Sequence, residues 1–261
     1  MKAPLLRKLR IMAVSVYGTL YISIAALYRV NIRRNYLRSY GDKIFRWWAE
    51  TLCGVARINY KINDPHELTI EPGKRYIVMC NHRSLYDIPL SVLSIPGSLR
   101  FLTKKELFRV PIWGQGLKVG EFVSIDRSNL EQAIKDLARA RAMMESGIVL
   151  WIAPEGTRSP DGKLGKFKKG GFVMAIESGA TIIPVGIRGS ENVLPPKTFD
   201  LYLDQDVEID IGAPIEASRY SMEERNELVE EVRGSIAGLC GEAGHEIGDD
   251  GEEAMVREIT G

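Results

Sequence analysis

The central part of the chain alternates between two hydrophobic patterns. Short apolar runs are typical of buried strands, and apolar residues at every third or fourth position are typical of helices. Strands are predicted at residues 57–62, 75–80, 99–103, 121–126, 147–153, 181–187 and 207–211. Helices are predicted at residues 84–93, 111–118, 129–145, 171–177 and 223–239. This alternation predicts an α/β fold, with a mostly parallel sheet flanked by helices.

The N-terminal part has a different pattern. Residues 11–28 contain no charged side chain. As a helix they would be about 27 Å long, close to the roughly 30 Å of a bilayer's hydrocarbon core. Basic residues flank the run on both sides, which gives a membrane span no preferred direction and argues against a cleaved signal peptide. An anchor lying in one leaflet, with both ends on the anionic cytoplasmic face, satisfies both flanks. A span, a signal peptide and a core helix are the alternatives.

A second helix is predicted after this run. From Leu37 to Val55 apolar residues recur every three or four positions, and Trp47 and Trp48 would suit the headgroup region of a membrane. The alternative is that this helix packs on the soluble domain. Three regions are therefore expected: N-terminal membrane-anchoring helices at 1–56, an αβ domain at 57–240 and an acidic, loose tail at 241–261.

Charge is distributed unevenly, although the formal net charge is only +1. Residues 1–46 carry ten Lys or Arg and one acidic residue, Asp42, whereas residues 241–261 carry seven acidic residues and one Arg. Because the basic segment lies beside the apolar run, the expected partner is a membrane surface and not a nucleic acid. The three cysteines are widely spaced, without a CxxC pair or a Cys/His cluster. Neither a metal site nor a disulfide framework is expected, and a reducing cytoplasmic environment is the simpler interpretation.

The sequence NHRSLYD, residues 81–87, follows a predicted buried strand and allows two interpretations. Ser84 and Asp87 have the spacing of a capping box, in which each side chain accepts a backbone N–H at a helix start. That interpretation leaves His82 unexplained. Just before the helix, His82 lies within reach of Asp87, which would bind one ring nitrogen and leave the other as a general base.

A second group of charged residues follows the fifth predicted strand. APEGTRS, residues 153–159, carries Glu155 and Arg158 in a turn at the strand's carboxyl end, where α/β sheets bind ligands. KFKKGG, residues 166–171, places Lys168 and two further lysines directly before a helix, an arrangement that favours anion binding. The chain has no Walker motif, so a nucleotide triphosphatase is not expected.

Further cations occur between these two motifs. Lys104 and Lys105 follow one predicted strand, and Arg127 ends the segment GEFVSIDR at residues 120–127. Each alone is explained as a solvated surface charge. Together with Arg158 they would meet at one edge of a parallel sheet, where two arginines can hold a phosphate through paired hydrogen bonds.

Four segments occur in an order that carries a family resemblance: NHRSLYD, GEFVSIDR, APEGTRS and IIPVGI at residues 182–187. They resemble the motif blocks of the glycerolipid acyltransferases, above all the bacterial 1-acyl-sn-glycerol-3-phosphate acyltransferases of the PlsC type. The resemblance covers roughly residues 75–190. It implies an αβ acyltransferase domain that moves a fatty acyl group from acyl-CoA or acyl carrier protein to the sn-2 hydroxyl of lysophosphatidate, giving phosphatidate. No cofactor is implied beyond the acyl donor itself.

The resemblance also implies roles for individual residues. His82 and Asp87 match the family's catalytic pair, and Ala153 stands where the family commonly has Phe. Arg127 matches the family's second block, and Glu155, Gly156, Arg158 and Ser159 match its third. With the lysines argued above from the charge pattern, the predicted substrate-binding residues are Lys104, Lys105, Arg127, Glu155, Gly156, Thr157, Arg158 and Lys168.

The resulting hypothesis is that His82, held by Asp87, removes the proton of the acceptor hydroxyl as it attacks the thioester. The leaving thiol has a pKa of about 8.5 and needs no dedicated acid. The chain has no G-x-S-x-G motif for a covalent acyl-enzyme. The predicted location is the cytoplasmic face of the inner cell membrane, where the acceptor lies.

Other hypotheses remain open. Another lysophospholipid or glycerol 3-phosphate would serve as acceptor with the same motifs. Water as the acceptor would give a lipid or thioester hydrolase. In a membrane-anchored lipid-binding module, His82 would be dispensable.

Overall fold

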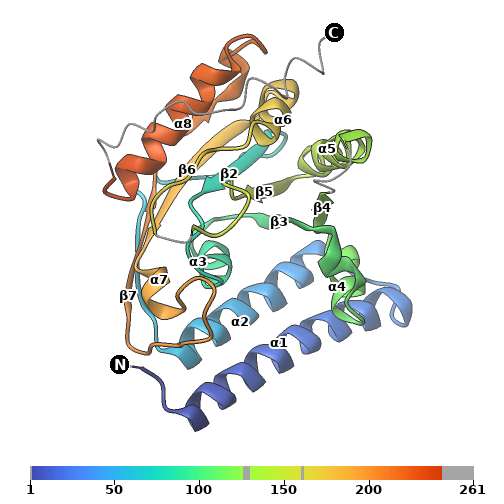
Figure 1. Ribbon diagram of the computed structural model, residues 1–261. Coiled ribbons are helices and arrows are strands. Elements are labelled where there is room, and N and C mark those ends of the chain that lie inside the picture. The colour runs from blue at the N-terminus through green and yellow to red at the C-terminus, as the bar shows by residue number, and fades with distance from the viewer. Residues whose placement is uncertain (1, 126–129, 160–161, 243–261) are drawn as a thin grey trace.

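One eight-stranded sheet organises the computed structural model, which describes residues 2–125, 130–159 and 162–242 (Figure 1). The strands are β1 Asn59–Asn63, β2 Tyr76–Cys80, β3 Ser98–Lys104, β4 Val123–Ile125, β5 Ile148–Ile152, β6 Thr181–Arg188, β7 Asp206–Ile211 and β8 Ile215–Glu216. Their order across the sheet is β1-β7-β6-β2-β5-β3-β4, and β8 pairs with β6.

Most neighbouring strands run parallel. This holds from β6 through β2, β5 and β3 to β4, and for β1 with β7. Only β7 and β8 pair with β6 in the antiparallel direction among the described strands. The predicted mostly parallel sheet is therefore confirmed. Because β2, β5 and β3 share one direction, the segments that follow Cys80, Ile152 and Lys104 meet at one edge of the sheet.

Helices cover both faces of this sheet (Figure 1). They are α1 Leu5–Asn31, α2 Arg38–Ala56, α3 Asp87–Ser94, α4 Trp113–Val119, α5 Leu130–Glu145, α6 Gly170–Ser178, α7 Ser190–Val193 and α8 Arg225–Leu239, with 3-10 helices at Lys105–Arg109 and Ala217–Arg219. Successive side chains of β2 point to opposite faces, as in any strand. Ile77 and Met79 pack in the core under α5, α6 and α8, whereas Val78 and Cys80 pack in the core under α2 and α3.

The two N-terminal helices form an outer layer along the domain (Figure 1). Among the described helices, α1 alone is long and apolar enough to cross a membrane by length and composition. Its N-terminal end is nevertheless fastened to the domain. Lys2 pairs with Asp200 at 2.7 Å, and the N–H of Ala3 donates to the carbonyl of Leu201 at 2.8 Å.

The C-terminal half of α1 is also held. The indole N–H of Trp48 in α2 donates to Thr19 at 3.1 Å. Gly116 of α4 lies so close to Ser23 that a Cβ on the glycine would come within 2.6 Å of the serine Cβ. The helix therefore packs along the domain instead of projecting from it.

The predicted elements are confirmed with shifts of a few residues at their ends. The short helix α7, the two-residue strand β8 and the 3-10 helices were not predicted, because each is too short to show a period. Most of the predicted acidic tail, residues 243–261, lies outside the described part of the chain.

Candidate active site

Asn81 fixes the chain where β2 ends. Its side chain is buried, donates to the carbonyl of Ile187 at 2.9 Å and accepts from the N–H of the same residue at 2.8 Å. These two bonds continue the contact between β2 and β6 beyond Cys80, where strand pairing stops. The residue that follows, His82, is thereby set at the carboxyl edge of the sheet.

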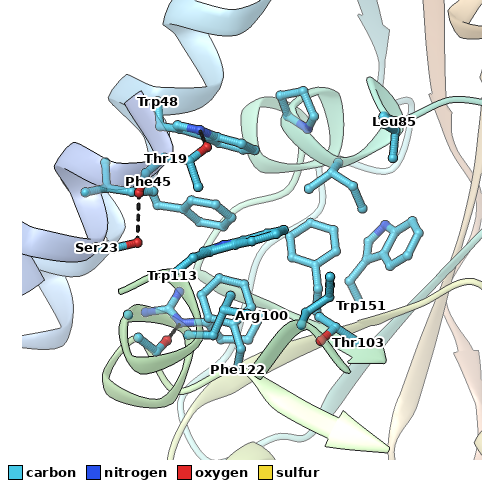
Figure 2. A pocket seen from close by; sticks show the side chains of 18 of the residues that line it. Thr19, Ser23, Phe45, Trp48, Leu85, Arg100, Thr103, Trp113, Phe122 and Trp151 are labelled. Carbon is cyan, nitrogen blue, oxygen red and sulfur yellow. Dashed lines mark hydrogen bonds between the residues drawn. The ribbon is translucent and has the colours of Figure 1, made fainter. Parts of the chain in front are cut away.

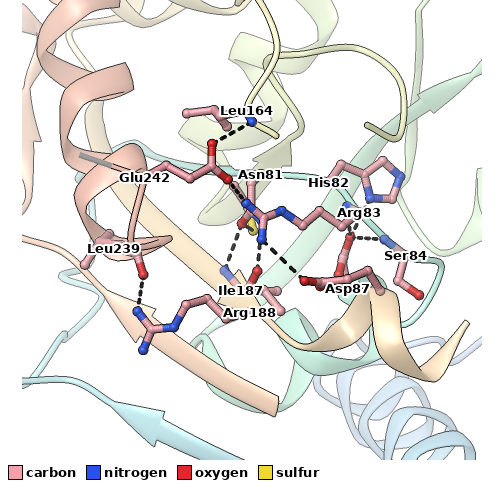
Figure 3. A network of polar contacts seen from close by, with 12 residues as sticks. Asn81, His82, Arg83, Ser84, Asp87, Leu164, Ile187, Arg188, Leu239 and Glu242 are labelled. Carbon is pink, nitrogen blue, oxygen red and sulfur yellow. Dashed lines mark hydrogen bonds and ion pairs between the residues drawn. The ribbon is translucent and has the colours of Figure 1, made fainter. Parts of the chain in front are cut away.

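His82 and Asp87 form the predicted pair. Nδ1 of His82 lies 2.8 Å from Oδ2 of Asp87, which also accepts the backbone N–H groups of Arg83 at 2.7 Å and Ser84 at 2.8 Å (Figure 3). Asp87 is fully buried. A carboxylate oxygen in this position favours the tautomer of a neutral imidazole that carries its proton on Nδ1, which leaves the Nε2 lone pair available. The pair is thus arranged as a base with its orienting carboxylate.

Half of the predicted capping box is present. The helix α3 begins at Asp87, later than predicted, and Asp87 accepts the N–H of Ser84. The Ser84 hydroxyl accepts from the N–H of Tyr86 at 3.3 Å and donates to the carbonyl of Leu194 at 3.0 Å. The same carboxylate therefore orders the turn before the helix and orients the histidine, so the two interpretations of NHRSLYD are compatible.

The turn after β5 forms two hydrogen bonds with the backbone of His82. The N–H of Ser159 donates to the carbonyl of His82 at 2.8 Å, and the N–H of His82 donates to Glu155 at 3.1 Å. The other oxygen of Glu155 accepts the N–H of Gly165 at 2.9 Å. Burial raises the pKa of the Glu155 carboxyl, while its two backbone hydrogen bonds act in the opposite direction. Glu155 therefore bridges two backbone segments.

His82 lines a cavity of about 870 Å³ that lies between the sheet and the N-terminal helices. Its wall includes Phe45 and Trp48 of α2 together with Trp113 and Phe122 (Figure 2). The Phe45 ring packs edge-on against Phe122, with ring centroids 5.3 Å apart. The His82 ring stands edge-on to Trp151, with ring centroids 5.9 Å apart. A largely apolar cavity of this size with a few polar groups is typical of a small-molecule site.

Arg100 is a buried cation in the wall of this cavity. Its side chain is 2% exposed, pairs with Asp42 at 2.8 Å and donates to the carbonyls of Gly120 and Leu99 at 2.5 and 2.9 Å. These bonds hold the guanidinium in place against Asp42 and the two backbone carbonyls. The sequence pattern assigned Arg100 only to a strand, because Asp42 and Gly120 lie in distant segments of the chain.

Several predicted residues line the same cavity as His82. These are Gly156, Thr157 and Arg158 of the turn after β5 and Lys104 at the end of β3. The candidate base and a candidate phosphate-binding arginine thus border one space. Sheet topology accounts for this, since β2, β5 and β3 are neighbours with the same direction.

Other predicted residues lie elsewhere. Glu155 is buried and is not among the described residues that line the cavity, and its two oxygens accept backbone N–H groups. Lys105 and Lys168 are not among the described residues that line the cavity, and Lys168 is exposed just before α6. Arg127 lies outside the described residues. Within the described ranges, no group of three His, Cys, Asp or Glu side chains is arranged to hold a metal ion.

Three comparisons with known proteins agree with this geometry. Residues 61–188 match the family model described as Acyltransferase. This segment is therefore similar to the acyltransferase family. In the crystal structure of the 1-acyl-sn-glycerophosphate (LPA) acyltransferase PlsC from Thermotoga maritima, the fold is shared with a TM-score of 0.70 and 25% identity, over 93% of this chain and 100% of that one.

Curated relatives carry related names. A chloroplastic 1-acyl-sn-glycerol-3-phosphate acyltransferase of Brassica napus is 30% identical over 161 residues, which are 62% of this chain and 45% of that protein. The 1-acyl-sn-glycerol-3-phosphate acyltransferase of Pseudomonas aeruginosa is 30% identical over 172 residues, 65% of this chain and 64% of that protein. This chain thus matches less than two thirds of the length of either relative. The resemblance carried by the four sequence blocks is confirmed.

Proposed function

We propose that the protein transfers a fatty acyl group from an acyl thioester, carried by coenzyme A or acyl carrier protein, to the sn-2 hydroxyl of lysophosphatidate. The product is phosphatidate. The observation that carries the proposal is the hydrogen-bonded pair of His82 and Asp87 on the wall of an apolar cavity that Arg158 also lines. The names of the relatives support the same substrates.

In the proposed reaction His82 is the general base. Because Asp87 holds the Nδ1 proton, Nε2 takes the proton of the sn-2 hydroxyl as its oxygen attacks the thioester carbonyl. A C–O ester bond forms, the C–S bond breaks and the thiolate leaves with the bonding electrons. A thiol pKa of about 8.5 lets the thiolate leave without a separate acid. The proton on the imidazolium then passes to solvent or to the thiolate.

The cations at the cavity would hold the acceptor's phosphate. Arg158 and Lys104 line the cavity with His82, and arginine binds phosphate through two parallel hydrogen bonds. Arg127 is proposed for the same role from the family resemblance. Lys105 and Lys168 would add to the positive potential that draws an anionic substrate towards the site. The apolar part of the cavity would take a fatty acyl chain.

The outer face of α1 would bind the membrane. The exposed large apolar side chains of α1 are Leu5, Leu6, Leu9, Met12, Val16, Tyr17, Tyr21, Ile24 and Tyr28, and Ile32 directly after the helix is exposed as well. Such a long exposed apolar surface is typical of a membrane-binding site. Basic residues near both ends, among them Arg7 and Arg33, would attract anionic lipids of the cytoplasmic leaflet. Since α1 packs along the domain, this binding favours an anchor in one leaflet over a span, with the active site at headgroup depth.

The test is product analysis by mass spectrometry. Purified protein in anionic vesicles is incubated with isotopically labelled lysophosphatidate and with a mixture of acyl donors, some carried by coenzyme A and some by acyl carrier protein. We expect labelled phosphatidate with the new acyl group at sn-2. Release of free fatty acid without labelled phosphatidate would instead identify a hydrolase and refute the proposal.

A further inference from the structure

Two carboxylates bridge the same two segments of the chain, and only one of them belongs to the motif blocks. Glu155 accepts the N–H of His82 at 3.1 Å and the N–H of Gly165 at 2.9 Å. Glu242 accepts from the guanidinium of Arg83 and from the N–H of Leu164 at 2.8 Å (Figure 3). The two bridges attach to the adjacent residues His82 and Arg83 at one end and to the adjacent residues Leu164 and Gly165 at the other. They therefore run side by side between the loop that joins β2 to α3, here called the His82 loop (residues 81–86), and the segment after β5.

The Arg83 guanidinium is nearly buried and is paired with two carboxylates. Its side chain is 7% exposed and lies between Glu242 and Glu191, the latter at 3.5 Å. A buried cation requires paired anions, and a charge-assisted hydrogen bond is stronger than a neutral one. Arg83 also donates its backbone N–H to Asp87 at 2.7 Å. Its side chain and backbone therefore connect Glu242 to the carboxylate that orients His82.

Glu242 reaches this position from the far end of the chain. It follows α8, and its N–H donates to the carbonyl of Ala237 at 2.8 Å, a bond that caps the end of the helix after Gly241 with its positive φ. It lies outside residues 61–188, the range that matches the acyltransferase family. Glu242 neither lines the cavity nor contacts His82 or Asp87 among the interactions described. Its influence on the site acts through Arg83 and Leu164.

We propose that Glu242 is a positioning residue that, in parallel with Glu155, holds the His82 loop against the segment that carries Arg158. The inference rests on the proposed function, because the distance that matters is the one between the base and the group that binds the acceptor's phosphate. A displacement of about 1 Å between reacting groups costs on the order of 10²-fold in rate. The two bridges share one task, so the loss of both exceeds the product of the two single losses.

The experiment uses the full-length chain in anionic vesicles with four variants: Glu242→Gln, Glu242→Ala, Glu155→Gln and the double variant Glu155→Gln/Glu242→Gln. Glu230→Gln is the matched control, since Glu230 lies exposed on α8. We expect Glu242→Ala to lower kcat and raise the KM for lysophosphatidate, with about a tenfold loss in kcat/KM and an unchanged donor KM. Glu242→Gln, which keeps an acceptor for Leu164, loses less. The double variant loses more than the product of its parents, and Glu230→Gln is unchanged.

Hydrogen exchange provides a readout that needs no substrate. Loss of a hydrogen bond to a charged group speeds local opening about ten- to a hundred-fold. In Glu242→Ala this acceleration is expected at the amides of Arg83, Ser84 and Leu164, with little change in the strands of the core.

Two results would overturn the proposal. One is unchanged exchange at these amides in Glu242→Ala. The other is kcat and acceptor KM within twofold of wild type in that variant, with a double variant that loses only the product of its parents. Absence of phosphatidate from wild-type protein would refute the proposed function alone, and the exchange measurement would still decide the role of Glu242.

Discussion

The His82 loop and the cavity beside it are held in different ways. The loop is fixed by directional bonds to buried groups: Asn81 to β6, Asp87 to His82, and Glu155 to two backbone amides. The cavity is shaped by packed aromatic side chains from α2, β3, α4 and β5, with Arg100 as a fixed cation in its wall. Chemistry requires exact placement of a few atoms, whereas a flexible acyl chain requires only a space of the right length.

This difference predicts how the two regions fail. A substitution in the catalytic pair removes a bond that no other bond replaces, so the rate falls for every substrate. A substitution in the cavity changes its shape, so the preference among acyl donors changes while the chemical step persists.

The largest effect is expected for Asp87→Asn. The amide no longer fixes the proton of His82 on Nδ1, so in a large share of molecules the proton lies on Nε2 and the histidine cannot act as the base. We expect kcat to fall by about 10²–10⁴-fold. Steady-state kinetics with lysophosphatidate measures this, and circular dichroism melts show whether the variant folds. A folded variant within fivefold of the wild-type kcat would mean that Asp87 does not orient the base.

The next effect concerns the cavity. Ala26 of α1 is 4% exposed and lines the cavity, and Ala26→Leu fills part of it. Rejection of one excess methylene is worth about 10–200-fold in kcat/KM, so the preference should shift towards shorter acyl donors by about that factor. Competition between acyl donors of different length measures the shift. Ala25→Leu is the matched control, because Ala25 is the neighbouring alanine and is not among the described lining residues. An equal shift in both variants would show that the cavity does not hold the acyl chain.

Arg158→Ala tests the polar edge of the same cavity. Loss of hydrogen bonds to a phosphate costs about 1.5–3 kcal/mol, so the KM for lysophosphatidate should rise about ten- to a hundred-fold. The KM for monoacylglycerol, which lacks the phosphate, should change little. Arg219→Ala, at an exposed site in the second 3-10 helix, should change neither. An identical rise with both acceptors would assign Arg158 a structural role.

The double substitution Leu6→Ser/Leu9→Ser tests the outer face of α1. These side chains are 82% and 52% exposed, so their removal leaves the packing of the domain largely unchanged. We expect about a tenfold loss in partitioning onto anionic vesicles, since burial of a leucine contributes about 1.5–3 kcal/mol at most. Sedimentation with vesicles measures it, with Met222→Ser as control for another exposed apolar residue. Equal binding of all three proteins would locate the membrane contact elsewhere.

The smallest effect is expected for thiol reagents. Burial raises the pKa of Cys53 and of Cys240 to about 12, and the pKa of Cys80 rises as well. At pH 7 a thiol with that pKa is ionised in about one molecule in 10⁵, and the thiolate is the reactive form. Native protein treated with N-ethylmaleimide should keep its full activity. Rapid inactivation together with labelling of one cysteine would contradict the mechanism, which uses no thiol of the protein.

The sequence allowed more to be predicted about the His82 loop than about the walls of the cavity. The strands and the long helices followed from their hydrophobic periods, and the pairing of His82 with Asp87 followed from local spacing. The shared cavity of His82 and Arg158 followed from the rule that parallel strands end at one edge.

What the sequence did not predict depends on distant partners. The walls of the cavity come from α1, α2, β3 and α4, and nothing local marks Arg100 as buried. The contact of Arg83 with Glu242 joins residues 159 positions apart, so no pattern or spacing could have indicated it. The hydrogen bonds of Glu155 were not predicted for a similar reason, because both of its partners are backbone amides.

The measurement closest to the central claim is phosphatidate synthesis by His82→Ala, with labelled lysophosphatidate in vesicles. The account predicts labelled phosphatidate from wild-type protein and a rate at least about 10²-fold lower from the variant, with both proteins folded and bound to the vesicles. A folded, membrane-bound His82→Ala protein that makes phosphatidate at the wild-type rate would contradict the claim that this histidine is the base.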